Sequence, residues 1–131
     1  MSKIKLMLAL AAMGAALFTV GCQTTQVSVD SKTFGTAEYR NGCLYGKVKG
    51  NVDKVFIAAN KAIDKLGYFR TTGDEPAKSM TQMVGARAKG DVRIEILLQE
   101  KQPGVTDARI AVGRGEPAKS QDILNKIYDN M

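Results

Sequence analysis

The sequence contains no histidine, and this absence removes several kinds of catalytic site. Histidine is the usual general base near neutral pH, the partner of serine in hydrolase dyads and the commonest metal ligand. No G-x-S-x-G, C-x-x-C or P-loop motif occurs, and the 13 acidic residues do not form a calcium-binding loop. We therefore expect a protein that is not an enzyme and that uses no metal and no cofactor.

The longest apolar stretch, residues 6–20, is shorter than the roughly 20 residues that a bilayer-spanning helix needs. It follows a short start that carries Lys3 and Lys5, and small residues come directly after it. A basic start, an apolar run and small residues are typical of a secretory signal peptide. Residues 1–21 are therefore predicted to be cleaved off and to take no part in the fold.

The apolar run ends in FTVGC, residues 18–22, which resembles the lipobox of bacterial lipoproteins. Gly21 and Cys22 fit that pattern, whereas Thr19 stands where such proteins usually have leucine. The resemblance implies that the thiol of Cys22 carries a diacylglycerol thioether and that its new amine is acylated, for example with palmitate. Gln23, which is not aspartate, implies the outer membrane as destination. An ordinary signal-peptidase site, with Cys22 as a bystander, is the alternative.

Cysteine is scarce, since the chain has only two. If Cys22 is lipidated, Cys43 has no partner for an internal disulfide in the mature chain. Cys43 is then most simply a small buried side chain, and a reactive or intermolecular thiol is the alternative.

The chain has 19 basic residues against 13 acidic ones, so it stays mildly basic after Lys3 and Lys5 are removed. Charges dispersed over a solvated surface explain this balance most simply. A strip of Lys54, Lys61 and Lys65 in contact with anionic lipid or peptidoglycan is the alternative.

The mature chain divides into residues 22–37, the lipidated N-terminus and a flexible tether, and residues 38–131, a globular domain. The tether is rich in Thr, Ser and Gln, although the alternation at residues 26–29 leaves room for an edge strand. Helical spacing of apolar residues predicts one helix from Val52 to Leu66, with Asn51 as N-cap, and another that begins near Pro117. Residues expected on the apolar side of the second helix are Ser120, Ile123, Leu124, Ile127 and Met131.

Alternating apolar and polar residues predict strands at residues 44–49, 68–72, 80–88, 92–99 and 105–112. The order is therefore strand, helix, strands, helix. It predicts an α+β fold, a two-layer sandwich in which an antiparallel sheet of four to five strands carries both helices on one face.

Two further places in the domain are candidates for binding. The side chains of Phe56, Tyr68, Met80 and Met83 are candidates for lining an apolar pocket between helix and sheet, because methionine adapts to irregular apolar shapes. Filling of the core is the alternative. The loop at residues 113–115 resembles an anion-binding loop before a helix, but the charge of Glu116 and the missing N–H of Pro117 disfavour that function.

Several segments of the chain stand in a characteristic order and spacing: Cys22, Tyr45-Gly46, VFIAANKAIDKLG, VRIEILL, VTDARIAVG and ILNKI. In this order and spacing they resemble a family of small bacterial lipoproteins described only as a domain of unknown function, and within it an outer-membrane lipoprotein of the tularaemia bacterium. The resemblance covers nearly the whole mature domain. It implies a fold and a location, and it implies no activity.

The expected function is that of an outer-membrane-anchored lipoprotein with a non-enzymatic binding or structural role in the cell envelope, with a contribution to host interaction left open. The expected partners are the membrane, through the acyl chains, and an envelope protein or peptidoglycan. Nucleic acid is not expected as a partner of an exported protein. The alternative function is that of a carrier or sensor of a small apolar ligand held between helices and sheet.

Overall fold

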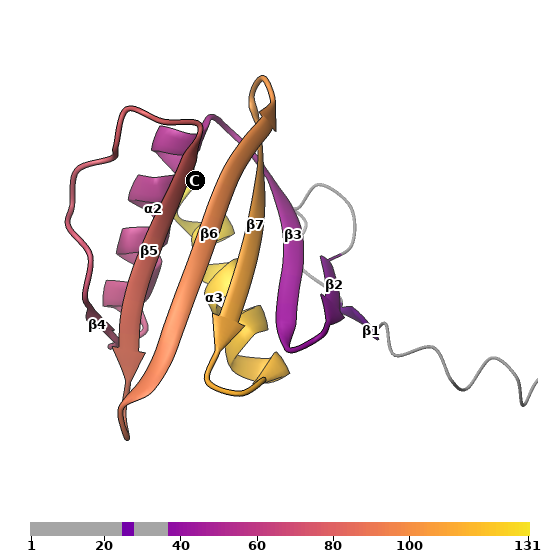
Figure 1. Cartoon of the computed structure of the whole chain (residues 1–131), viewed down its shortest axis with the longest axis vertical. Helices are drawn as coiled ribbons and strands as arrows, with labels where there is room; N and C mark the ends of the chain where they lie inside the picture. The colour runs from indigo at the N-terminus through magenta and orange to yellow at the C-terminus, as the bar shows by residue number, and fades with distance from the viewer. Residues whose placement is uncertain (1–24, 28–36) are drawn as a thin grey trace, which may run out of the picture.

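Seven strands form one antiparallel sheet in the computed structural model, which describes residues 25–27 and 37–131 (Figure 1). The strands are β1 (Thr25–Val27), β2 (Ala37–Arg40), β3 (Cys43–Lys49), β4 (Phe69–Arg70), β5 (Thr81–Ala88), β6 (Val92–Gln102) and β7 (Val105–Val112). Their order across the sheet is β1-β2-β3-β7-β6-β5-β4. Helix α2 (Val52–Lys65) connects β3 to β4, and helix α3 (Pro117–Asp129) follows β7.

The predicted fold of four to five strands in the order strand, helix, strands, helix is wrong. Three strands precede α2 instead of one, and four strands follow it. Strand β2 was missed although its turn has a clear signature: Asn41 and Gly42 both have positive φ, at 52° and 79°. A pair of left-handed residues is what a two-residue hairpin turn requires, and Asn-Gly is the commonest pair there. The hairpin places β2 beside β3 and widens the sheet toward the N-terminal side.

Both helices lie over the same face of the sheet (Figure 1). On the three long strands β5, β6 and β7, every second residue is buried against the helices, as the period of two in a strand dictates. The buried apolar members of this set are Val84, Ala86, Ala88, Ile94, Ile96, Leu98, Ala108, Ile110 and Val112. The core therefore lies between the helices and one face of the sheet, and the other face of the sheet is left uncovered by the described elements.

Helix α2 begins where the sequence predicts it. Asn51 is the N-cap, and its side-chain oxygen accepts a hydrogen bond from the backbone N–H of Lys54 at 2.9 Å. Such a bond satisfies one of the N–H groups that have no partner at a helix start. The chain leaves the helix at Gly67, whose φ of 78° is left-handed and suits glycine. The residues that α2 buries are Val52, Val55, Phe56, Ala58, Ala59, Asn60, Ala62 and Ile63.

Helix α3 packs against β3 and β7. Gly46 on β3 allows this close approach, because a β-carbon at that position would lie 2.9 Å from a methyl group of Leu124. The predicted apolar side of α3 includes Met131, which instead lies beyond the helix and is 45% exposed. Tyr128 takes the buried place, with 1% of its surface exposed, and its hydroxyl donates a hydrogen bond of 2.7 Å to the backbone oxygen of Lys47.

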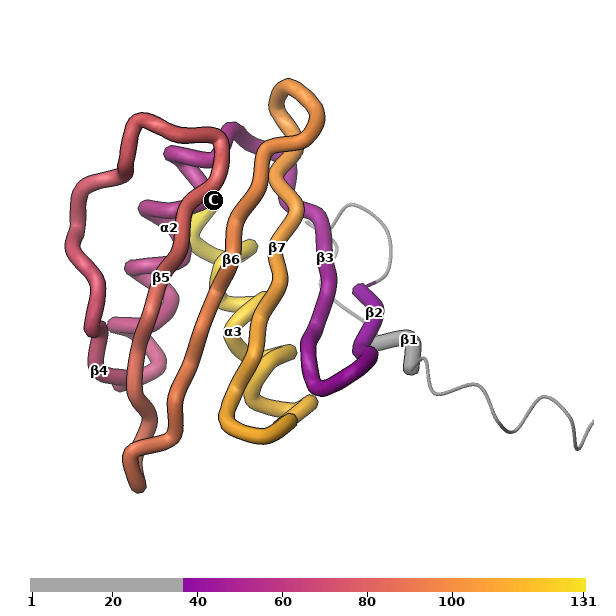
Figure 2. Tube along the Cα trace, viewed as in Figure 1, coloured from indigo at the N-terminus to yellow at the C-terminus, as the bar shows by residue number. Residues whose placement is uncertain are grey.

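Three connections lie together at one end of the sheet, as the trace in Figure 2 shows. They are the β2–β3 turn, the β5–β6 turn and the connection from β7 to α3. The backbone N–H of Gly113 donates to the oxygen of Arg93 at 2.7 Å, which ties the second and third of these connections together. A β-carbon on Gly42 would lie 4.0 Å from the α-carbon of Gly115, so the first and third are neighbours too.

Replacement of Phe56 by alanine tests the packing of α2. Phe56 is 4% exposed in the core, so Phe56→Ala should lower the free energy of unfolding by about 3 to 5 kcal/mol. Ile57, the next residue of the same helix, is 44% exposed, and Ile57→Ala should change stability by less than about 1 kcal/mol. Urea denaturation followed by circular dichroism measures both. Equal losses in the two variants would contradict the assignment of the buried side of α2.

Tyr128 predicts a dependence of stability on pH. Burial raises the pKa of Tyr128 to about 12 from its ordinary value of 10.0, so the folded state retains the phenolic proton more strongly than the unfolded state. The stabilisation is therefore complete below pH 10 and is lost as the pH rises from 10 toward 12. Near neutral pH, Tyr128→Phe should be less stable by about 1 kcal/mol through the lost hydrogen bond. Denaturation at a series of pH values should show this difference shrinking through the alkaline window, and a constant difference would contradict the assignment.

Candidate functional site

The predicted lipid attachment residue, Cys22, and the predicted signal peptide, residues 1–21, lie outside the residues that the structure describes. The first described strand, β1, begins three residues after Cys22 and pairs with β2. In this pairing Thr25 lies opposite Tyr39. The segment predicted as a tether, residues 22–37, thus contains a short edge strand. Within the described part of the chain, neither helix is long and apolar enough to cross a membrane.

The structure does not bring together the four residues predicted to line an apolar pocket. Phe56 is buried in the core, and Tyr68 packs at the margin of the core. Met80 is 62% exposed, and Met83 is 49% exposed. Met83 pairs with Leu97 on the face of the sheet that the helices do not cover, whereas Gln82 and Val84 are buried toward the helices.

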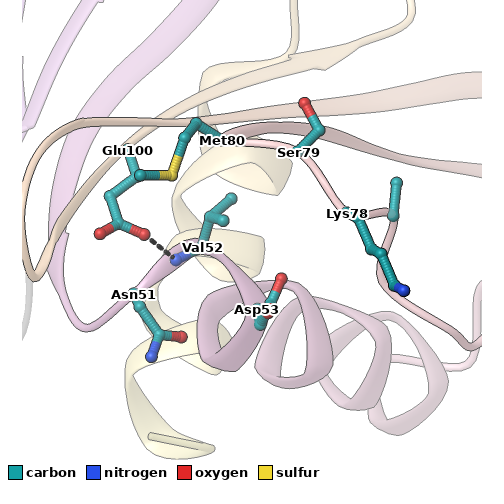
Figure 3. Close-up of a pocket in the computed structure, with 8 residues that line it drawn as sticks. Asn51, Val52, Asp53, Lys78, Ser79, Met80 and Glu100 are labelled. Carbon is teal, nitrogen blue, oxygen red and sulfur yellow. Dashed lines mark hydrogen bonds between the residues drawn. The ribbon is translucent and has the colours of Figure 1, made fainter.

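Met80 lies beside the amino terminus of α2, at a surface depression of about 530 Å³ (Figure 3). One carboxylate oxygen of Glu100 accepts a hydrogen bond from the backbone N–H of Val52 at 2.7 Å, and the other accepts from the N–H of Gly104 at 3.2 Å. Negative charge is favourable at this end of a helix, where N–H groups lack partners and the helix dipole is positive. The chain's own carboxylate therefore occupies the position that an anionic ligand would take.

A second polar side chain, Gln82, fixes the segment that lines one side of this depression. Gln82 is only 4% exposed. Its amide nitrogen donates to the carboxylate of Asp53 at 2.7 Å and to the backbone oxygen of Ala77 at 3.0 Å. Its amide oxygen accepts from the backbone N–H of Ala77 at 3.2 Å. The amide thus ties the segment before β5 to the first turn of α2, which gives Gln82 a structural explanation.

Two N–H groups of the loop at residues 113–115 are already hydrogen-bonded within the chain, whereas an anion-binding loop would offer them to a ligand. The N–H of Gly113 is bonded to Arg93, and the N–H of Gly115 donates to the backbone oxygen of Val112 at 3.0 Å. Glu116 is the N-cap of α3 but makes no capping hydrogen bond with its side chain, and Pro117 stands in the first turn. Both observations weigh against an anion at this helix start.

The uncovered face of the sheet carries a shallow depression of about 260 Å³. Its lining residues are Cys43, Met83, Glu95, Leu97, Arg109 and Ala111. Cys43 is a free thiol and is half-buried there, so it is not the core residue that the sequence predicted. Beside it, the guanidinium of Arg40 lies 4.3 Å from the centre of the Tyr45 ring, a favourable cation–π distance. Apolar and charged side chains thus alternate on this face.

Groups with a raised pKa lie far apart in the described part of the chain. Burial raises the pKa of Tyr128 in the core, and burial with the nearby Cys43 and Glu116 raises the pKa of Tyr39. Hydrogen bonds to Asp74 and Asp64 raise the pKa of Arg70 at the opposite edge of the sheet. Several perturbed groups in one cleft would mark a catalytic site. Here each shift has a separate, structural cause.

Among residues 25–27 and 37–131, no group of three or more cysteine or acidic side chains is arranged to hold a metal ion. The predicted basic strip of Lys54, Lys61 and Lys65 lies exposed on α2. Its side chains belong to the helix side of the molecule, away from the uncovered face of the sheet.

Comparison with curated proteins finds no match. A family model described as "Protein of unknown function (DUF3568)" matches residues 3–130. The match confirms the predicted resemblance to a family of unknown function. The lipoprotein character and the likeness to a protein of the tularaemia bacterium stay predictions. Because the match spans nearly the entire sequence, the chain belongs to the DUF3568 family of proteins of unknown function.

Proposed function

We propose that this chain is a lipoprotein that is cleaved before Cys22 and held on the outer membrane by acyl chains on that residue. The observation that carries the proposal is the arrangement of residues 1–22: two lysines, an apolar run and the Gly21-Cys22 pair. The resemblance to small bacterial lipoproteins supports it.

The number of acyl chains determines how firmly such a protein is held. A single chain of myristoyl length binds a bilayer only with a constant of about 10⁴ M⁻¹, whereas two or more chains give stable attachment. A diacylglycerol thioether on Cys22 supplies two chains, and an acylated amine supplies a third. The anchor therefore needs no help from the protein surface to keep the domain on the membrane.

We propose a binding or structural role for the domain rather than catalysis. The lack of histidine and the separate structural causes of the raised pKa values support this role. The uncovered face of the sheet supports the binding part, because Met83 and Leu97 lie beside Arg109 there with no described element over them. An envelope protein or peptidoglycan is the proposed partner.

The alternative role, a carrier of a small apolar ligand, receives no support from the described residues. The space between helices and sheet is filled by side chains such as Ile63, Ile96 and Ile127, each 0% exposed. The two candidate methionines, Met80 and Met83, point away from that space. Native mass spectrometry of protein purified from its host tests this alternative. A small lipid that co-purifies with the domain would support the carrier role.

Replacement of Cys22 tests the anchor. Because Cys22→Ser removes the lipobox cysteine, its own signal peptide is not expected to be cleaved. This variant is therefore also expressed behind an ordinary cleavable signal peptide, so that a retained signal peptide is not mistaken for acylation. Cys22→Ser should take up no labelled palmitate and should be released from membranes by a carbonate wash. Cys43→Ser is the matched control and should behave as wild type, since only one of the two thiols is acylated. Intact mass of the wild-type protein should exceed that of residues 22–131 by the acyl groups.

The destination within the envelope is tested at the residue after the lipid. If Gln23 directs the protein to the outer membrane, Gln23→Asp should move most of it to the inner membrane fraction of a density gradient. Gln23→Ser should leave it with the outer membrane, because this change keeps position 23 polar and uncharged. Wild-type protein that fractionates with the inner membrane would refute the outer-membrane location without affecting the lipid anchor.

A further inference from the structure

We infer that one end of the sheet docks on the phosphate groups of the membrane in which the lipid is anchored. This end, here called the turn end, comprises residues 40–42, 87–93 and 113–119. The inference rests on the proposed lipidation of Cys22 and adds to it an orientation of the domain and a surface for anionic phospholipid. It is carried by the register of β1, by the charges of the three connections and by an exposed phenylalanine.

The register of β1 fixes which part of the domain is close to the lipid. Thr25 lies opposite Tyr39, which is one residue from Arg40 and the turn at residues 41–42. Three peptide units separate Cys22 from Thr25, and each spans about 3.8 Å between α-carbons, so the two α-carbons lie within about 11 Å of each other. The anchor therefore holds the β1 corner of the turn end near the headgroups, whatever path residues 23–24 take.

The turn end is basic. Its three segments contain six basic residues, Arg40, Arg87, Lys89, Arg93, Arg114 and Lys119, against two acidic residues, Asp91 and Glu116. Asp91 pairs with Arg87 at 3.1 Å, Glu116 pairs with Lys119 at 3.3 Å, and Arg93 pairs with Glu95 of β6 at 3.8 Å. Arg40, Lys89 and Arg114 are exposed and form no ion pair with residues 25–27 or 37–131. The guanidinium of Arg40 lies over the ring of Tyr45, a contact that leaves its positive charge without an acidic partner in this part of the chain.

These three cations without an ion pair lie in a row across the sheet. Arg40 ends β2, Arg114 follows β7, and Lys89 follows β5, and these strands are separated by β3 and β6 in the sheet. At about 4.8 Å between neighbouring strands, the row from Arg40 to Lys89 is roughly 20 Å long. A single small anion cannot contact cations so far apart, whereas a plane of lipid phosphates can. The spacing therefore favours a membrane surface over a soluble phosphate.

An exposed aromatic residue lies at the same end. Phe69 on β4 is 75% exposed and pairs with Arg87 at the start of the β5–β6 turn. Aromatic side chains next to basic ones are typical of protein surfaces that lie in the headgroup region of a bilayer. Charges at the far end of the sheet are too distant to interact with the headgroups at the same time. The 11 residues of β6 span about 35 Å, whereas charges are screened over about 8 Å at physiological salt.

The experiment measures which end of the lipidated protein lies on the membrane. In a Cys43→Ser background, a fluorophore is attached at Ala118→Cys, at the turn end, or at Gln102→Cys, at the far end; both positions are exposed and uncharged. The purified lipoprotein is reconstituted in vesicles of phosphatidylcholine, with or without phosphatidylglycerol, that contain a headgroup quencher. The readout is the ratio of quenching at position 118 to quenching at position 102.

Each basic residue near an anionic surface shifts such an equilibrium about fivefold, so three shift the ratio of docked to undocked protein about a hundredfold. The quenching ratio should therefore rise strongly when phosphatidylglycerol is added and fall again in high salt. Arg40→Glu with Arg114→Glu should abolish the rise. Lys54→Glu with Lys78→Glu, two exposed lysines toward the far end, is the matched control and should keep it.

Two results would overturn the inference. The first is a protein that floats with the vesicles but has the same quenching ratio with and without phosphatidylglycerol, or a ratio that both pairs of substitutions lower equally. In that case the proposed orientation is wrong, and the proposed lipid anchor is unaffected. If the protein does not float with the vesicles and its intact mass shows no acyl groups, the anchor and the orientation both fall.

Discussion

The packing of two helices on one face of the sheet is the interaction on which the rest of the structure depends. Strand β6 lies near the middle of the sheet and buries Ile94, Ile96 and Leu98 completely on the helix side. Apolar burial contributes about 25 cal/mol for each Å² removed from water, and these side chains lose all their exposure. The intervening residues of β6 point to the other face and carry the charges of Arg93 and Glu95. One strand therefore divides the molecule into a dry interior and a charged, uncovered face.

The same regular alternation of side chains explains which predictions from the sequence are confirmed. The helix after Asn51 and the strands at residues 92–99 and 105–112 have regular patterns, and the structure has elements there. The same alternation explains why Met83 lines no pocket under the helices: it is out of phase with the buried Gln82 and Val84, so it points to the uncovered face. Met80 precedes β5 and is exposed. Cys43 is likewise out of phase with Leu44, which is 0% exposed, and so it points to the uncovered face.

Other features depend on contacts between distant residues, which a local pattern cannot reveal. Glu100 caps the amino terminus of α2, 48 residues earlier in the chain, from a part of β6 that extends beyond the predicted strand. Tyr128 contacts the backbone of Lys47, 81 residues earlier. Strand β2 differs, because the Asn41-Gly42 pair is a local signal for the turn that follows it. Its four residues, Ala37–Arg40, span the predicted boundary between tether and domain, so only three of them fall within the predicted domain.

The edge strand β1 determines how the proposed lipid on Cys22 would act on the domain. With β1 paired, three peptide units lie between Cys22 and the sheet, which is a reach of about 11 Å. Without β1, the chain from Cys22 to Ala37 would have a reach of about 54 Å, and the domain would turn freely above the membrane. A long tether averages the orientation of a small domain, whereas a short one keeps one corner of it among the headgroups. If Cys22 carries the proposed lipid, the pairing of three residues with β2 makes that lipid a constraint on orientation, and the charges at one end of the sheet then matter more than those at the other.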